Sequence, residues 1–238
     1  MDNRTEQLAD GVWRVEVGFY VNTFAVANDG RGDADGLTIV DTGLAHHGSR
    51  LVRSIRLLGL DPRATTEVLL THWHRDHAGS AAKLARSSAR PRVAAGRADL
   101  AVVRGQARAR DTLTAAGTGA RLAARIGLPA PAEPVPDAVP LDDGQRLATS
   151  GIEVVSTPGH TPGHCAFLLP DRGVLLAGDA VFNVWRLARG SRLACADVAA
   201  RDATIHALAG RDFDVLALAH GPAVTHAAKD RLARLAGA

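Results

Sequence analysis

The sequence is short of the residues that mark several common classes of protein. It contains only two cysteines, Cys165 and Cys195, which are too few for a framework of disulfides and fit a reducing compartment. No apolar run approaches the roughly 20 residues that a membrane-spanning helix needs. Residues 1–7 are polar and lack the apolar core of a signal peptide. We therefore expect a cytoplasmic protein that does not bind membranes.

Net charge and aromatic residues are also scarce. The formal net charge is +3, and the arginines are spread along the chain rather than gathered in a block, which disfavours nucleic-acid binding. Aromatic residues make up 4% of the chain, so alanine and aliphatic side chains must fill most of the core. With 46% hydrophobic and 22% charged residues, the composition is typical of a globular protein of one large or two small domains.

Histidine, in contrast, is concentrated in one place. Residues 71–79 read THWHRDHAG and hold three histidines and one aspartate, namely His72, His74, His77 and Asp76. The cluster follows a short apolar segment that is typical of a buried strand, and it precedes an alanine-rich segment that is typical of a helix. Imidazole and carboxylate groups suit zinc, iron or manganese, and strand-to-helix turns are a usual place for a site. The sequence therefore predicts a metal site here.

The spacing within this cluster predicts two half-sites rather than one closed site. His72 and His74 lie two residues apart and point the same way if the segment is extended, whereas Asp76 and His77 follow where the chain bends into a helix. Each half-site then needs further ligands from strand ends later in the chain. Three residues follow segments that are typical of buried strands downstream: His160, Asp179 and His220.

Together these positions resemble the pattern of the metallo-β-lactamase superfamily, His-x-His-x-Asp-His followed by a distant His, Asp and His. The resemblance runs from about Val12 to His220. It implies two metal ions, Zn2+ in the first instance with iron or manganese as alternatives, that share one aspartate. The first ion would be bound by His72, His74 and His160. The second would be bound by Asp76, His77 and His220, with Asp179 bridging both.

The resemblance also draws attention to residues around the predicted metals. Asp41 follows a predicted strand, where it either braces the metal-binding loops or pins its own turn. Trp73, between two predicted ligands, either packs beneath the loop or lines the substrate cleft. His164 stands four residues after a predicted ligand, and we expect it to form hydrogen bonds within its loop. Phe182 stands where quorum-sensing lactonases of the family usually place a tyrosine that assists the substrate.

Strands flanked by helices recur in both halves of the sequence. We expect strands near residues 12–17, 20–28, 37–40, 67–70, 92–95, 152–155, 165–169, 174–178 and 214–219, and helices over residues 48–60, 197–208 and 226–235. This pattern predicts an α/β fold in which two sheets lie face to face with helices outside. The resemblance implies the same architecture, a four-layer αββα sandwich.

The middle of the chain is less regular. Residues 98–127 are rich in alanine and arginine, are predicted to be mostly helical, and are a candidate for a lid over the metals. Residues 127–140 carry five prolines, which predicts an extended connector. Because predicted ligands lie on both sides of this connector, we interpret it as a crossover between two halves of one domain that spans residues 1–238.

The predicted chemistry is hydrolysis of a small-molecule substrate. Metal ions lower the pKa of bound water from about 16 towards 7, so a hydroxide held by a dinuclear zinc site is the expected nucleophile. Asp76 is the residue expected to pass on its proton. The chain has no Gly-x-Ser-x-Gly motif that would supply a serine nucleophile. Residues 178–182 look most like glyoxalase II, so we expect cleavage of a thioester, ester or lactone.

Other functions stay open at this stage. Mononuclear iron persulfide dioxygenases keep most of these residues and bind one iron through the equivalents of His72, His160 and Asp179. Lactonase or β-lactamase activity could accompany the main reaction. Zinc β-lactamases typically carry cysteine or serine at the position of Asp179, which disfavours antibiotics as the principal substrate. The sequence does not define the oligomeric state, for which a homodimer is one candidate.

Overall fold

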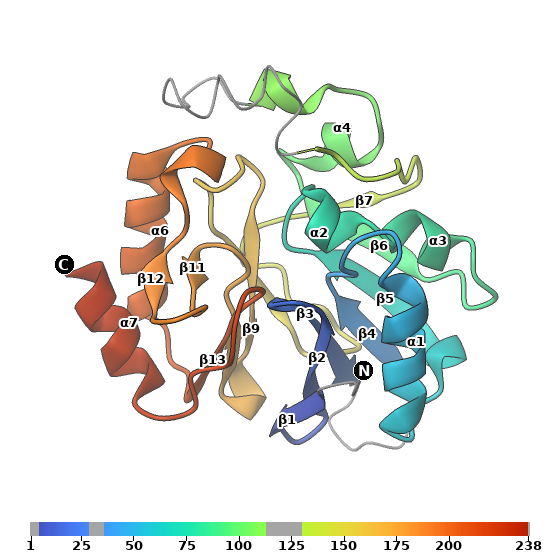
Figure 1. Ribbon diagram of the computed structural model, residues 1–238, viewed down its shortest axis with the longest axis horizontal. Helices are drawn as coiled ribbons and strands as arrows, with labels where there is room; N and C mark the ends of the chain where they lie inside the picture. Colours follow the sequence, from blue (N-terminus) through green and yellow to red (C-terminus); the bar gives the residue numbers. More distant parts are fainter. Residues whose placement is uncertain (1–4, 29–35, 113–129, 238) are drawn as a thin grey trace.

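The computed structural model describes residues 5–28, 36–112 and 130–237 of the chain. Within these residues two β-sheets lie face to face, and helices cover the outer face of each (Figure 1). The predicted αββα sandwich is therefore confirmed. In the same part of the chain, no helix is both long and apolar enough to cross a bilayer.

The N-terminal sheet contains seven strands that lie in the order of the chain. They are β1 (Thr5–Ala9), β2 (Val12–Gly18), β3 (Val21–Ala27), β4 (Leu37–Val40), β5 (Thr65–Leu70), β6 (Arg92–Gly96) and β7 (Val139–Leu141). Strands β1 to β4 pair antiparallel, whereas β4 to β7 pair parallel. The carboxyl ends of β4, β5 and β6 therefore lie at one edge of this sheet.

The C-terminal sheet contains four strands in the spatial order β13-β10-β9-β8. Their bounds are β8 (Glu153–Ser156), β9 (Cys165–Leu169), β10 (Val174–Leu176) and β13 (Val215–Ala217). β9 runs antiparallel to both β8 and β10, and β10 pairs parallel with β13, so β8, β10 and β13 all end at the same edge. A separate pair of short strands, β11 (Val181–Phe182) and β12 (Ala188–Arg189), follows β10.

Helices cover the outer faces of both sheets (Figure 1). The α-helices are α1 (Gly48–Leu57), α2 (Arg75–Ala78), α3 (Ala81–Ala85), α4 (Leu100–Val103), α6 (Val198–Ala209) and α7 (Ala228–Ala236). Short 3-10 helices occupy Pro62–Ala64, Ala109–Thr112, Pro170–Arg172 and Arg192–Ala194. α1 and α3 contact the N-terminal sheet, while α7 contacts the C-terminal sheet and packs on α6. The single-domain organisation of residues 1–238 stays a prediction.

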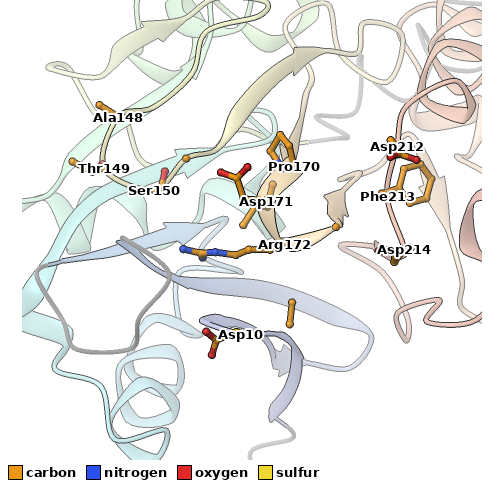
Figure 2. A pocket seen from close by; sticks show the side chains of 14 residues that line it. Asp10, Ala148, Thr149, Ser150, Pro170, Asp171, Arg172, Asp212, Phe213 and Asp214 are labelled. Carbon is orange, nitrogen blue, oxygen red and sulfur yellow. The ribbon is translucent and has the colours of Figure 1, made fainter.

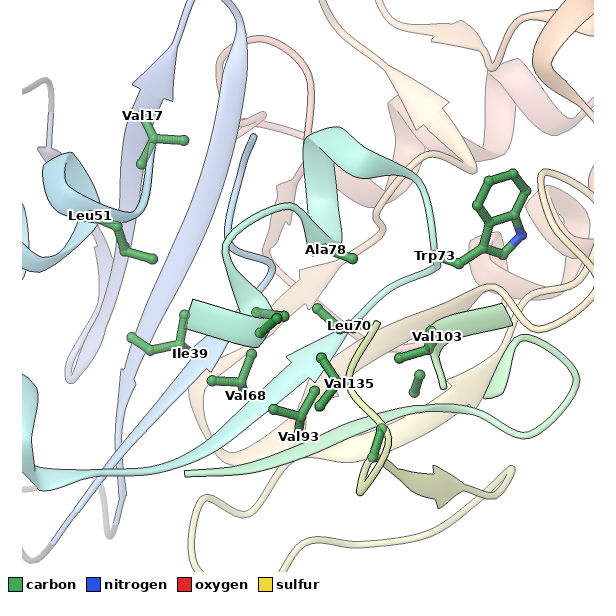
Figure 3. Close-up of a cluster of buried hydrophobic side chains, with 14 of the residues drawn as sticks. Val17, Ile39, Leu51, Val68, Leu70, Trp73, Ala78, Val93, Val103 and Val135 are labelled. Carbon is green, nitrogen blue, oxygen red and sulfur yellow. The ribbon is translucent and has the colours of Figure 1, made fainter. Parts of the chain in front are cut away.

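Strand β5 shows how the apolar core is divided. Leu69 faces the other sheet, where it packs in one cluster with Phe24 and Phe167. Val68 and Leu70 face the helices and belong to a second cluster (Figure 3). Side chains along a strand alternate between its two faces, and here both faces are buried. This is why the strand that leads into the histidine cluster is a continuous apolar run rather than an alternating one.

The structure departs from the sequence prediction mainly between β6 and β8. The sequence predicts a mostly helical segment interrupted at Gly105, but the described residues after β6 hold only α4 and the short 3-10 helix Ala109–Thr112. Gly105 between them has a φ of 73° that ends α4. Residues 113–129, and with them most of the predicted lid, lie outside the described residues. The connector contains β7, which the sequence does not predict. β7 forms the sheet edge, where a strand tolerates a proline such as Pro140.

Truncating a leucine between the sheets should cost far more stability than truncating one at the surface. Leu69 is 0% exposed and Leu57 is 67% exposed. We expect Leu69→Ala to lower the free energy of unfolding by about 2–5 kcal/mol, because it leaves a cavity that the sheets cannot close. Leu57→Ala should change it by less than about 0.5 kcal/mol. Urea denaturation of both variants checks this, and similar losses would contradict the assigned packing.

Candidate metal centre

The two sheets are joined at the edge where their parallel strands end. The backbone N–H of Cys165 donates to the carbonyl of Thr71 at 2.8 Å, and the N–H of Asn22 donates to the carbonyl of Ala219 at 2.9 Å. All the predicted metal ligands follow strands at this edge. His72, His74, Asp76 and His77 follow β5, His160 lies between β8 and β9, Asp179 follows β10, and His220 follows β13.

The structure brings all seven side chains together in three overlapping groups. In each group the candidate ligand atoms lie within 4.8 Å of one another. The groups are His72, His74 and His160; His72, His77 and Asp179; and Asp76, His77 and His220. The first group is fully buried, and the last includes two side chains that solvent reaches, since Asp76 is 33% and His220 is 17% exposed. The cluster therefore has a closed side and an open side.

Asp179 faces both ends of this cluster. Its Oδ2 lies 3.4 Å from Nε2 of His160. Its Oδ1 lies 3.4 Å from Nε2 of His77 and 3.5 Å from Nε2 of His220. These separations are short enough for both atoms of each pair to contact one ion at about 2.0–2.2 Å. One carboxylate can therefore serve ligand groups on both sides of it.

Several atoms that face the cluster are buried without a hydrogen-bond partner. They include Nε2 of His72, Nε2 of His77 and Oδ1 of Asp179. Leaving a polar atom buried and unpaired costs free energy, and such atoms in native proteins normally have a partner. A cation among them would satisfy all three at once, and nitrogen and carboxylate ligands suit Zn2+ and similar metals. The residues present therefore fit a metal ion.

The buried imidazoles on the closed side are neutral. Burial lowers the pKa of His160 to about 4, and it holds the pKa of His72 and His74 well below the usual value, helped by the neighbouring histidines. A neutral imidazole offers a lone pair, so these three residues can bind a metal at neutral pH without first losing a proton.

On the open side, the aspartates reverse this effect. Burial alone would lower the pKa of His77 and His220, but the charge of Asp179 raises both, and Asp41 and Asp76 add to the effect at His77. Burial would raise the pKa of Asp179, yet His220 and His77 hold it well below its usual range. The charges of these residues attract one another across 3.4–3.5 Å, although Nε2 of His77 and Oδ1 of Asp179 form no hydrogen bond. A bound cation would replace this attraction by displacing protons.

Asp41 fixes the orientation of His77. Its Oδ2 lies 2.8 Å from Nδ1 of His77, and the same carboxylate accepts hydrogen bonds from the N–H and the hydroxyl of Thr71, each at 2.8 Å. With Nδ1 bonded to Asp41, Nε2 of His77 points into the cluster. This is the arrangement by which outer residues orient metal-binding histidines. Asp41 adopts a left-handed backbone with a φ of 58° to do so.

His220 is oriented in a similar way by the turn between β2 and β3. Its Nδ1 donates to the carbonyl oxygen of Tyr20 at 2.9 Å, so that Nε2 faces Asp76 and Asp179. Tyr20 also has a left-handed backbone, with a φ of 54°. The ring of Phe182, which is half-buried, packs edge-on against His220 at 5.0 Å between centroids. Phe182 therefore lies at the open side of the cluster.

His164 is bonded on both ring nitrogens. Nε2 accepts the backbone N–H of Asp179 at 3.0 Å, which makes Nδ1 the donor to the hydroxyl of Thr157 at 2.7 Å. Neither nitrogen is then available to a metal. The residue instead holds the backbone at Asp179, and the loop hydrogen bonding expected from the sequence is what the structure contains.

Trp73 lies in the core and not at a cleft. It is 1% exposed and joins the helix-side cluster with Leu70, Val103 and Val135 (Figure 3). Its ring packs edge-on against that of His74, with 4.3 Å between centroids. Trp73 therefore packs in the core, whereas its neighbours His72 and His74 face the cluster. Of the two roles that the sequence left open, the structure supports packing beneath the loop.

A cavity of about 780 Å³ lies at the opposite end of the strands. It is lined by the turns that precede β2, β10 and β13, including Asp10, Asp171, Arg172 and Asp214 (Figure 2). Asp179 and His220 follow the other ends of β10 and β13. This cavity is therefore separate from the histidine cluster and plays no part in it.

Two residues that support the cluster are not found by sequence reasoning. Tyr20 contributes only a carbonyl oxygen, which every residue carries, so nothing in its identity predicts the contact. Asp99 is a buried acid that accepts hydrogen bonds from Thr161 and Gly163 beside His160. It follows β6 by three residues, and its place after a strand parallel to β5 is the signal that could have indicated it.

The chain belongs to the metallo-β-lactamase superfamily. The sequence model of that superfamily matches residues 17–220, which include all seven predicted ligands. A crystal structure of a metallo-β-lactamase family protein from Thermus thermophilus superposes with a TM-score of 0.71 and is 24% identical. That comparison covers 97% of this chain and 80% of the other, and it supports the fold.

The matches to curated relatives each cover only part of this chain and part of the relative. An uncharacterized protein of Bacillus subtilis, YobT, is 27% identical over 162 residues, which cover 68% of this chain and 62% of that protein. The hydroxyacylglutathione hydrolase GloC of Haemophilus influenzae is 29% identical over 153 residues, or 63% of this chain and 64% of that protein. The chain thus spans less than two thirds of the length of these relatives.

The burial of His164 predicts a pH dependence of folding. Burial lowers its pKa to about 3, below the usual value of 6.5, so between pH 6.5 and 3 the unfolded state binds a proton that the folded state does not. Stability must then fall as pH falls through this range, by about 1.4 kcal/mol per pH unit from this residue.

The variant His164→Asn removes the titrating group, and its amide, which lies near the position of Nδ1, can still bond to Thr157. Denaturant unfolding of chelator-treated protein from pH 7 to pH 4 should show a shallower loss of stability for this variant. Equal slopes for both proteins would contradict a neutral, buried His164.

Proposed function

We propose that this chain is a hydrolase that cleaves a thioester, ester or lactone with the help of two zinc ions. The observation that carries the proposal is the position of Asp179, whose two oxygens face separate groups of histidines at 3.4–3.5 Å. Membership of the superfamily supports a metal-dependent hydrolase in general. The name of the Haemophilus relative, a hydroxyacylglutathione hydrolase, supports a thioester in particular.

The ligands divide between the two ions as follows. His72, His74 and His160 would hold one ion on the closed side, Asp76, His77 and His220 would hold the other on the open side, and Asp179 would contact both. Bound zinc would supply an acidified water as nucleophile and would polarise the carbonyl of the substrate. The neutral imidazoles of the closed side and the carboxylates of the open side suit the charge of two divalent ions.

Asp76 is the residue best placed to handle a proton. Its Oδ2 lies 3.5 Å from Nε2 of His220 and 3.7 Å from Nε2 of His77. The Asp76 side chain is 33% exposed, whereas Asp179 is 5% exposed and enclosed by imidazoles. A carboxylate that reaches both the cluster and solvent can accept the proton of the attacking water and pass it to the leaving group.

The substrate enters from the open side in this proposal. Phe19 and Trp185 are large hydrophobic residues with exposed side chains. Each is close in sequence to a residue that forms a hydrogen bond with His220. Phe19 precedes Tyr20, and Trp185 follows Asn183, whose N–H donates to the carbonyl of His220 at 3.0 Å. Exposed aromatic side chains beside a site can bind the apolar part of a ligand. We therefore expect a substrate with an apolar acyl group.

A panel of thioesters, lactones, β-lactams and phosphodiesters, assayed on protein of known metal content, tests the function. We expect about two zinc ions per chain and turnover of a thioester, ester or lactone. His74→Ala should lose one ion and at least about 100-fold in kcat, because it removes a ligand from the closed side. His206 is exposed on α6, so His206→Ala should keep both zinc ions and the full kcat.

Each contrary result has a distinct meaning. No turnover on the panel, or full activity in His74→Ala, would overturn the hydrolase. A single ferrous iron with consumption of oxygen would instead identify the dioxygenase that shares many of these residues. Turnover of β-lactams alone would move the substrate class away from acyl esters.

The expected binding of an apolar acyl group can be tested at Trp185, which is 95% exposed. Trp185→Ala should raise KM about tenfold for a long-chain acyl thioester, which corresponds to about two buried methylene groups, and should leave the acetyl thioester nearly unchanged. Leu57→Ala, which removes an exposed leucine at the far end of α1, is the matched control. An equal change for both chain lengths would contradict the predicted contact.

A further inference from the structure

Asp99 connects the two loops that carry the closed side of the cluster. Its carboxylate is 0% exposed. Oδ2 accepts the hydroxyl of Thr161 at 2.6 Å, and Oδ1 accepts the N–H of Gly163 at 2.8 Å. The backbone N–H of Trp73 makes a third, weaker contact, which helps to lower the pKa of this carboxylate. One side chain thus bonds to the loop between β8 and β9 and contacts the loop after β5.

These donors are adjacent to three of the predicted ligands. Trp73 lies between His72 and His74, and Thr161 directly follows His160. Nε2 of His160 and Nδ1 of His74 are 3.0 Å apart, although the two residues are 86 positions apart in the chain. A separation that short depends on how the two loops are held together, and Asp99 contacts both of them.

Helix capping does not account for this carboxylate. Asp99 occupies the N-cap position of α4, but its side chain makes no capping hydrogen bond to that helix. The surrounding backbone is also closely packed. A Cβ added to Gly163 would lie 2.3 Å from the backbone nitrogen of Asp99, so the loop that carries His160 rests directly on the turn after β6.

Burial of Asp99 works against its charge. Burial raises its pKa to about 6, although the bonds from Thr161, Gly163 and Trp73 favour the ionised form and lower it. A carboxylate in such a place costs folding free energy unless its hydrogen bonds offset the lost hydration. The carboxylate and its buried donors, Thr161 and Gly163, therefore depend on one another.

We propose that Asp99 is a positioning residue that sets the spacing between His74 and His160, and through it the affinity of the closed side for metal. This inference rests on the proposed two-metal function. It assigns a role to a side chain that touches neither the ligands nor the substrate, and it predicts an effect on metal binding that goes beyond the effect on folding.

The test is zinc affinity, measured by competition with a chromophoric chelator on the full chain. Asp99→Ala removes all three contacts. We expect it to lower the affinity for the zinc ion of the closed side 10–100-fold, the usual effect of losing an outer residue that supports ligands. Asp99→Asn should retain most of the affinity, because its amide oxygen can accept from Gly163 and its amino group can donate to the hydroxyl of Thr161.

Thr38→Ala is the control for lost stability. Its hydroxyl is buried and donates to Asn28 at 2.8 Å, at the end of β4 remote from the metal loops. It should lower the unfolding midpoint and leave zinc affinity unchanged. If Asp99→Ala does not fold, Thr161→Val serves in its place, because it removes one of the three donors. It should lower the zinc affinity of the closed side by a smaller factor.

The outcomes separate the inference from the function. Wild-type protein that binds two ions, with Asp99→Ala binding as tightly, would overturn the positioning role alone. Equal losses of affinity in Asp99→Ala and Thr38→Ala would also overturn it, since the effect would then be one of stability. Wild-type protein that binds no zinc would overturn the two-metal function itself, together with the inference that rests on it.

Discussion

The centre of this protein depends on a carboxylate that is buried between imidazoles. The Asp179 side chain is buried and lies within 3.5 Å of nitrogen atoms from His77, His160 and His220. Taking such a charge out of water costs several kcal/mol unless opposite charges and hydrogen bonds replace its hydration. In this chain the replacement comes from both sheets, because His77 belongs to the first and His160 and His220 to the second. The charge of Asp179 is therefore stabilised only when the loops of both sheets lie at the same edge.

The meeting of the sheets follows from strand direction. β4, β5 and β6 are parallel in one sheet, and β10 and β13 are parallel in the other, so their carboxyl ends open at one edge. Short loops after these strands can then carry polar side chains while the strands themselves remain apolar on both faces. Rigid strands hold the ends in place, and the loops supply the chemistry.

The sequence predicts the ligands because their signal is local. Four of the candidate ligands fall within six residues, and the others each follow a segment typical of a buried strand, which places them near one edge. Their division between two metals comes from the family resemblance. The support around them is harder to predict. Tyr20 acts through its backbone and Asp99 through a loop more than 60 residues away, contacts that depend on packing rather than pattern. The same limit applies to β7, whose central proline, Pro140, obscures an edge strand.

The backbone conformation at Asp41 limits which amino acids can occupy this position. A φ of 58° is a conformation in which most side chains crowd the main chain, and glycine, asparagine and aspartate tolerate it best. Glycine would relax the main chain but leave Thr71 and His77 without their acceptor, and asparagine would turn one of the two acceptor oxygens into a donor. This position requires both a residue that tolerates a positive φ and a side chain with two acceptor oxygens. Aspartate is the amino acid that meets both requirements.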